Sequence, residues 1–164
     1  MNNRLERLRE KLEEMRLDAF LVSTPENRRY LSRFSGSAGN LLISKDQAIL
    51  ATDFRYIEQA QKQTSGFEIV KVTPGWSWLL DQMSTIEVTR VGYESHNMTV
   101  SSYKTITDSI KQLPAGKRQK YSLVATNGVV EALRSVKDSN ELSLLQKAID
   151  ISDKAMEAIT PTIK

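Results

Sequence analysis

Arginines beside aromatic residues are the side chains of this sequence whose types and spacing best suit binding chemistry. Arg28 and Arg29 precede Tyr30, Arg33 follows beside a glycine-rich turn, and Arg55 opens a further helical segment next to another tyrosine. Guanidinium groups near helix starts and a flexible loop can hold an anion, such as a peptide carboxylate, through paired hydrogen bonds. The alternative is that these are ordinary surface arginines whose aromatic neighbours belong to the core.

Other catalytic chemistries find little support in the residue types. The chain has no cysteine, which excludes thiol nucleophiles and cysteine-based metal sites, and one histidine cannot form a multi-histidine site. We interpret that residue, His96, as a solvated loop residue, with a catalytic base as the alternative. The glycine-rich segment 35–39 matches neither a phosphate-binding motif nor a nucleophile elbow, so it is predicted to be a structural turn, or one whose amides contact a ligand.

Composition places the chain among ordinary globular domains. Its 164 residues are 40% hydrophobic and 26% charged, and 23 basic residues against 20 acidic ones give a net charge of only +3. This balance predicts no nucleic-acid partner, and the densest basic cluster, Lys117, Arg118 and Lys120, is interpreted as a solvated loop. No apolar run approaches the ~18 residues that span a bilayer, and no targeting peptide is recognisable, so we expect no membrane partner and a cytoplasmic location.

Hydrophobic spacing predicts the elements that must position these residues. Leu5, Leu8 and Leu12 recur at helical intervals and predict an amphipathic first helix, whereas short apolar segments predict buried strands. Thr24 and Asp53 are expected to cap helices, the first of which opens with a proline. Strands are predicted at 19–23, 40–44, 47–52, 67–72, 89–94 and 121–125, with helices at 24–31, 53–64, 76–83, 100–113 and 127–136.

A longer helix is predicted from Asp138 onward. Asp138 and Glu141 form an aspartate version of the capping box, and Pro161 disfavours further regular helix. An apolar stripe continues over some five turns. It comprises Leu142, Leu145, Ile149, Ser152, Met156 and Ile159. Because strands and helices alternate and at least one hairpin is present, the predicted fold class is α/β with a mixed sheet.

Several blocks of the sequence resemble, in order, the N-terminal domain of Xaa-Pro aminopeptidases and prolidases, a group that includes creatinase. The blocks are 17–22 (LDAFLV), 25–31 (PENRRYL), 34–39 (FSGSAG), 52–56 (TDFRY) with Gln59 and Ala60, and 134–138 (RSVKD) with Glu141 and Leu142. Together they span almost the whole chain. Arg33 departs from the family, which usually has glycine there. Since glycine permits backbone angles that arginine resists, the family's loop geometry is not carried over, and Arg33 brings a new cation near the site.

The resemblance implies a central mixed sheet of about six strands flanked by helices, in a ribonuclease-H-like arrangement. It divides the chain into an N-terminal domain at 1–135 and a linker helix at 136–164, leading to a catalytic domain of pita-bread fold that is absent here. In such enzymes that domain holds two divalent metal ions, of manganese or cobalt type. The resemblance therefore implies no catalytic residue, no metal ligand and no hydrolysis in this excised domain alone.

The function implied by the resemblance is the non-catalytic part of a metal-dependent Xaa-Pro peptidase. Such domains contribute to a homodimer and help to admit only short peptides to the active site, where the substrate is a short proline-containing peptide. On this analogy, the residues that line or support the substrate entrance are Asn27, Arg29, Tyr30, Phe34 and Arg55. The apolar stripe from Leu142 to Ile159 is expected to dock on the absent domain, and its exposure here would favour self-association.

Two other functions stay open at this point. A protein-interaction module, stand-alone or a scaffold, would keep the peptidase-like fold, and downstream sequence would then lack one or more of the five metal ligands. A creatinase-type hydrolase would share the fold without using metal, and its activity would survive exhaustive chelation.

Overall fold

The computed structural model describes residues 3–73, 75–118 and 120–163. The chain divides into two compact units, 1–133 and 134–164, each of which is described by itself. In the described part of the chain, no helix combines the length and the apolar character that crossing a membrane requires.

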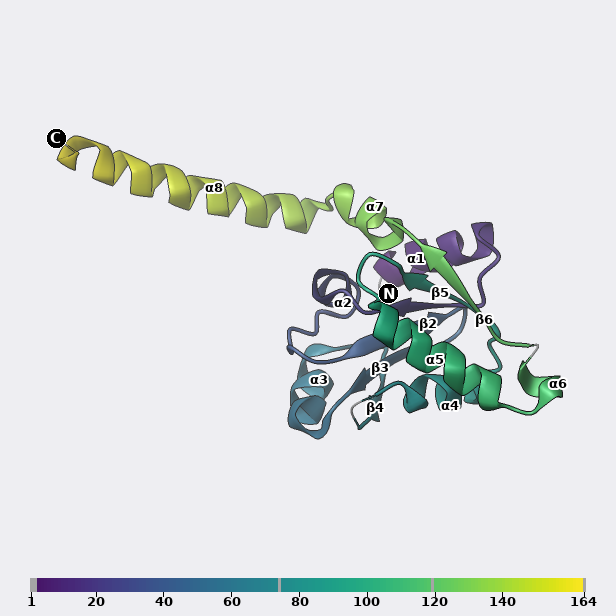
Figure 1. The fold of residues 1–164 in the computed structure, drawn as a ribbon. Coiled ribbons are helices and arrows are strands. Elements are labelled where there is room, and N and C mark those ends of the chain that lie inside the picture. Colours follow the sequence, from purple (N-terminus) through teal and green to yellow (C-terminus); the bar gives the residue numbers. More distant parts are fainter. Residues whose placement is uncertain (1–2, 74, 119, 164) are drawn as a thin grey trace. The chain divides into compact units, whose positions relative to one another are not determined.

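One six-stranded sheet organises the first unit, with the strand order β4-β3-β2-β1-β5-β6 (Figure 1). β2 pairs antiparallel with both β1 and β3, whereas β1–β5, β5–β6 and β3–β4 are parallel pairs. The mixed sheet confirms the predicted fold class. The strands are β1 (Ala19–Val22), β2 (Asn40–Ser44), β3 (Ala48–Thr52), β4 (Glu68–Lys71), β5 (Arg90–Glu94) and β6 (Ser122–Thr126).

Helices cover both faces of this sheet, and the side chains of β1 show how. Phe20 and Val22 lie in one buried cluster, and Ala19 and Leu21 lie in the other, because successive residues of a strand face opposite sides. Burial on both faces explains why the central strands are apolar throughout. The first cluster includes residues of α1 (Asn3–Glu14), α2 (Pro25–Ser32), α3 (Ile57–Gln63) and α7 (Val129–Ser135), and the second includes residues of α4 (Ser77–Thr85) and α5 (Val100–Gln112).

Local sequence sets most helix boundaries as predicted. α1 buries Leu5, Leu8 and Leu12 against the sheet. Asp53 accepts a hydrogen bond from the backbone N–H of Arg55 at 3.0 Å, but the element it caps is a short 3₁₀ turn, η1 (Phe54–Tyr56), which runs into α3. The predicted cap is therefore confirmed, while the helix behind it begins later.

Two local predictions are corrected. Thr24 occupies the N-cap position of α2 with extended backbone, yet its side chain makes no capping hydrogen bond. The basic segment around Arg118 was predicted to be a loop, but residues Ala115–Arg118 form a one-turn helix, α6. The turn closes because the carbonyl of Pro114 accepts the N–H of Arg118 at 2.9 Å, and the Arg118 side chain stays exposed.

The second unit consists of α8 (Ser139–Ile159) followed by the 3₁₀ turn η2 (Thr160–Thr162). The capping box is confirmed, since Asp138 accepts from the N–H of Glu141 at 2.8 Å and Glu141 accepts from the N–H of Asp138 at 3.0 Å. No residue of α8 is buried. Its large apolar residues are 48% to 69% exposed: Leu142, Leu144, Leu145, Ile149, Ile151, Met156 and Ile159.

Candidate functional site

The carboxyl ends of β1, β5 and β6 meet at one edge of the sheet, because these three neighbouring strands are parallel. Helix α2 begins at the same edge, two residues after β1. Open α/β sheets place ligand sites outside the carboxyl ends of their parallel strands. Polar residues gather here, and we call them the carboxyl-edge cluster: Ser23, Thr24, Asn27, Glu94, His96 and Glu131.

Glu94, the last residue of β5, is the centre of this cluster and is only 3% exposed. One carboxylate oxygen accepts the backbone N–H groups of Ser23 at 2.7 Å and Thr24 at 2.6 Å. The other accepts the Asn27 side-chain amide at 2.6 Å. A carboxylate at a helix N-terminus satisfies N–H groups that have no intrahelical partner and lies at the positive end of the helix dipole. Glu94 therefore caps α2 from a remote strand.

His96 and Glu131 form the outer part of the cluster. The Nε2 atom of His96 lies 3.2 Å from the Thr24 hydroxyl and 3.5 Å from a Glu131 carboxylate oxygen, which also accepts from Asn27 at 2.6 Å. The His96 side chain is 42% exposed, which confirms its interpretation as a loop residue. The His96 ring thus lies between the start of α2 and α7, within reach of a side chain from each.

The buried side chain of Arg28, which is 3% exposed, holds the glycine-rich turn at 35–39 by hydrogen bonds. Its two terminal nitrogens donate to the carbonyls of Gly36 and Gly39, while its Nε is buried without a hydrogen-bond partner in the described part of the chain. Burial lowers the pKa of the Arg28 guanidinium. Thr52 adds a hydrogen bond from its hydroxyl to the Ala38 carbonyl at 2.7 Å. The carbonyls of this turn are thus engaged inside the fold.

Asn27, Tyr30 and Phe34, three of the predicted entrance residues, are buried. The Tyr30 hydroxyl donates to the Leu133 carbonyl at 3.3 Å. The Phe34 ring lies under the glycine turn, where a Cβ at Gly36 would come within 2.2 Å of it. That close approach explains why glycine is needed at position 36, and it gives Phe34 a packing role.

Arg29 and Arg55, the other two predicted entrance residues, are exposed. Arg55 pairs through two nitrogens with the Asp53 carboxylate, at 2.9 and 2.8 Å. The hydrogen bond from Arg55 lowers the pKa of Asp53, and the same bond raises the pKa of Arg55. The Arg55 guanidinium also lies 5.3 Å from the Tyr56 ring, which in turn packs edge-on against Phe34 at 6.0 Å.

The structure therefore separates the predicted entrance residues into two places. Phe34 and Arg55 are linked through Tyr56, whereas Asn27 belongs to the carboxyl-edge cluster at the start of α2. Sequence reasoning did not select Glu94 or Glu131 for that cluster. The available signal was the position of Glu94 at the end of the predicted strand 89–94, because a carboxylate that such a strand buries needs partners.

The departure at Arg33 also has a structural outcome. Arg33 ends α2 with φ 64° and ψ 0°, so it adopts the left-handed conformation that favours glycine. Its N–H donates to the Arg29 carbonyl at 2.8 Å, which completes the end of the helix. The glycine-like geometry is thus kept here by an arginine.

The sheet order and the helices on both faces define an α/β domain built on a mixed six-stranded sheet. A family model for the creatinase/prolidase N-terminal domain matches residues 4–136, and the chain belongs to this family. The motifs that suggested the resemblance lie within or directly beside that matched range.

Relatives match over most of the chain. It is 35% identical to the uncharacterized peptidase YqhT of Bacillus subtilis, with 98% of this chain and 44% of the relative covered. A Xaa-Pro dipeptidase from Bacillus anthracis superposes with a TM-score of 0.88 at 35% identity, covering 99% of this chain and 43% of that one. The N-terminal domain of cytoplasmic peptidase PepQ from Mycobacterium tuberculosis gives a TM-score of 0.72 at 34% identity, with 81% of this chain and 99% of that chain covered. The chain spans less than half the length of the first two relatives.

Proposed function

We propose that this chain is the non-catalytic N-terminal domain of a metal-dependent peptidase that hydrolyses the bond before proline. The observation that carries the proposal is the match of nearly the whole chain to less than half of a Xaa-Pro dipeptidase. The match to the N-terminal domain of PepQ supports the same assignment, because it covers 99% of that domain and 81% of this chain. In this assignment, residues 1–135 are the N-terminal domain and residues 136–164 lead onward. The name of that relative also supports a cytoplasmic location.

The metal ions of the proposed peptidase belong to its catalytic domain. Among the described residues no group of three or more histidine, aspartate or glutamate side chains could hold a metal ion. The described residues therefore do not fit the two divalent ions, and the proposal gives them no step of the hydrolysis. Manganese or cobalt would be supplied to the remainder of the protein.

This chain would instead help to control which peptides enter the active site. Arg29 and Arg55 are exposed cations that suit the carboxylate of a short proline-containing peptide. Asn27, Tyr30 and Phe34 would support the entrance indirectly, since they are buried and fix α2 and the glycine turn. In a homodimer this domain would lie over the neighbouring subunit's active site.

The test is an assay of the full-length protein with Xaa-Pro dipeptides and longer peptides. We expect hydrolysis with manganese or cobalt, loss on chelation, and no hydrolysis by residues 1–164 alone. Activity that survives exhaustive chelation would favour the creatinase-type reaction. A full-length protein that binds no metal and cleaves no Xaa-Pro peptide would favour the scaffold function.

The entrance assignment is tested separately by Arg29→Ala and Arg55→Ala in the full-length enzyme. Each is expected to raise KM about threefold to tenfold, because a charge-assisted contact to the peptide is lost. Lys62→Ala is the matched control, an exposed cation on α3 that is paired with a carboxylate, Glu58 at 2.5 Å, as Arg55 is with Asp53, but that is not predicted to line the entrance. Unchanged kinetics in both arginine variants would overturn the entrance role.

A further inference from the structure

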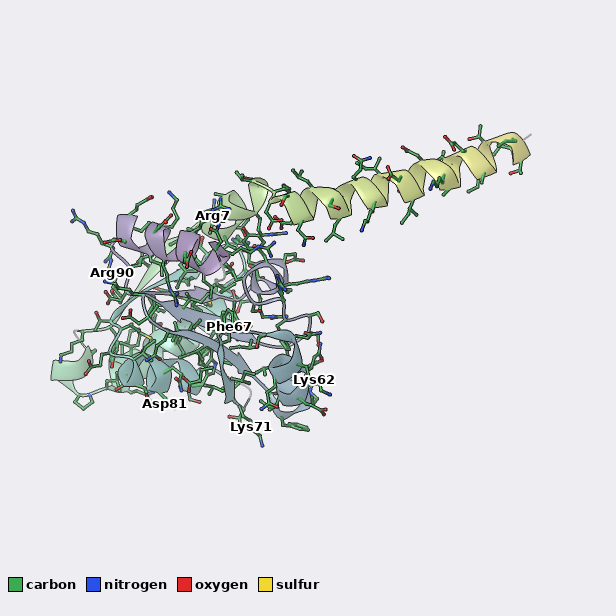
Figure 2. The ribbon with its side chains drawn as sticks, turned by 180° about the vertical axis from the view of Figure 1, so that it is seen from behind. Arg7, Lys62, Phe67, Lys71, Asp81 and Arg90 are labelled. Atoms are coloured by element: carbon green, nitrogen blue, oxygen red, sulfur yellow. The ribbon has the colours of Figure 1, made fainter. Side chains whose placement is uncertain are left out.

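A hollow of about 600 Å³ lies on the first unit, between α1, the end of α2, the β2–β3 turn and the segment that joins α3 to β4. Figure 2 labels two residues that directly follow lining residues in the sequence: Arg7, which follows Glu6 on α1, and Phe67, which follows Gly66. This volume falls within the range of small-molecule sites. The residues that line it include Glu6, Arg9, Arg33, Asp46, Ser65 and Gly66.

Arg33 is the most informative residue of this hollow. It holds a left-handed backbone conformation that is unfavourable for any residue with a Cβ. Its exposed guanidinium has no hydrogen-bond or ion-pair partner among the described residues. The left-handed conformation completes the end of α2, but no contact in the described part of the fold uses the guanidinium group.

Arg9 adds a second cation that is already oriented. Its Nε donates to the Ser44 carbonyl at 3.0 Å, which leaves its two terminal nitrogens available. Two carboxylates, Glu6 and Asp46, line the same hollow, and neither has a partner in the described part of the chain. Two cations and two anions that are not paired with one another suit a ligand carrying both signs of charge.

We propose that this hollow binds a short unblocked peptide as a zwitterion. Arg33 and Arg9 would take its carboxylate through charge-assisted hydrogen bonds, and Glu6 and Asp46 would take its ammonium group. An inorganic anion would gain less, because the two carboxylates oppose it. Only the charge and the size of the hollow carry this inference, so it does not depend on whether the full-length protein is a peptidase.

The experiment is a titration of the ¹⁵N-labelled chain with the dipeptide alanyl-alanine, followed through the backbone amides of Ser65 and Gly66. We expect saturable shifts with a Kd of about 1 mM, typical of a small, solvent-open site. Acetylation of the amino end and amidation of the carboxyl end should each weaken binding at least fivefold. Equal binding of the blocked peptides, or equal binding of inorganic phosphate, would overturn the proposal.

Arg33→Gly tests the key residue without harming the fold, because glycine accepts the same backbone angles. It should weaken binding at least tenfold, and Asp46→Asn should weaken it less. Arg16→Gly is the matched control, since Arg16 also has a positive φ of 53° and does not line the hollow. Equal affinity in the Arg33→Gly and Arg16→Gly variants would refute the assignment.

Discussion

Helices α2 and α8 satisfy the same need at their N-termini in opposite ways. α8 is capped by its own neighbours, through the reciprocal hydrogen bonds of Asp138 and Glu141. α2 receives no side-chain cap from Thr24 and depends on Glu94, which is 70 residues away along the chain. α2 has five buried residues in eight, whereas α8 has none in twenty-one.

This difference separates two sources of helix stability. α8 is held by local sequence, so it can form before any partner covers its apolar stripe. α2 is held by the tertiary fold, and its side chains in turn fix the glycine turn and the carboxyl-edge cluster. Disturbing α2 should therefore affect the whole first unit, whereas disturbing the start of α8 should remain local.

The largest effect is expected from Arg28→Ala. It removes two buried charge-assisted hydrogen bonds and leaves the Gly36 and Gly39 carbonyls without their donor. The free energy of unfolding should fall by about 3 kcal/mol, measured by urea denaturation. Arg29→Ala, on the exposed side of the same helix, is the control and should change it by less than about 0.5 kcal/mol. Equal effects of the two variants would show that Arg28 does not hold the turn.

Glu94→Gln should have the next largest effect and lower the free energy of unfolding by about 2 kcal/mol. An amide cannot accept hydrogen bonds from all the donors that the carboxylate serves. The N–H groups of Ser23 and Thr24 and the amide of Asn27 all point at this one group. The same substitution at exposed Glu26, in the first turn of α2, is the control. If both variants unfold at the same urea concentration, α2 does not depend on a remote cap.

Asp138→Ala tests the local cap of α8. It should destabilise the first turn of that helix by about 1 kcal/mol, because the N-cap hydrogen bond is lost. Faster amide hydrogen exchange at the start of α8 would report it, while urea unfolding of the first unit should not change. Asp153→Ala, an exposed mid-helix change, should leave this exchange as it is. A drop in the stability of the first unit would contradict the division between local and tertiary stabilisation.

The same contrast explains what could be predicted from the sequence. The strands, the stripe of α1 and the capping box of α8 depend on spacings of a few residues, so they were predicted correctly. The role of Glu94 depends on donors 70 and 71 positions away, and no local pattern carries that information. For the same reason Thr24 was predicted to be a side-chain cap, although its hydroxyl lies beside His96 instead.

The predicted entrance residues illustrate a second limit. Their types suggested a binding role, but type does not reveal burial. Tyr30 and Phe34 are used inside the fold, while Arg29 and Arg55 remain at the surface. Their part in an entrance stays a prediction.

Asp18 offers the smallest and most specific test of the comparison, because its carboxylate, like that of Glu94, accepts backbone N–H groups from a distant part of the chain, but in an exposed place and at the start of a strand. Its carboxylate accepts from the N–H and hydroxyl of Thr89 at 3.0 and 2.8 Å and from the N–H of Arg90 at 2.8 Å. Partial burial opposes its ionisation, but these hydrogen bonds outweigh it and lower the pKa of Asp18 below the ordinary value of 3.8. Because the pKa is lower in the folded chain, the stabilisation is present above that value and is lost as the pH falls through the folded pKa.

Asp18→Asn should therefore reduce the free energy of unfolding by about 0.5 to 1 kcal/mol at pH 7, a modest amount because water competes at an exposed site. The difference from the unsubstituted chain should shrink as the pH falls from 7 through the folded pKa of Asp18, because the carboxyl group then becomes protonated in the folded chain as well as in the unfolded one. Asp81→Asn, at an exposed position on α4, is the control and should change the free energy of unfolding at pH 7 by less than about 0.5 kcal/mol. A constant difference across this pH range would mean that Asp18 acts through its shape and not through its charge. The charge of a carboxylate that accepts distant N–H groups would then stabilise this fold only where the group is buried, as Glu94 is.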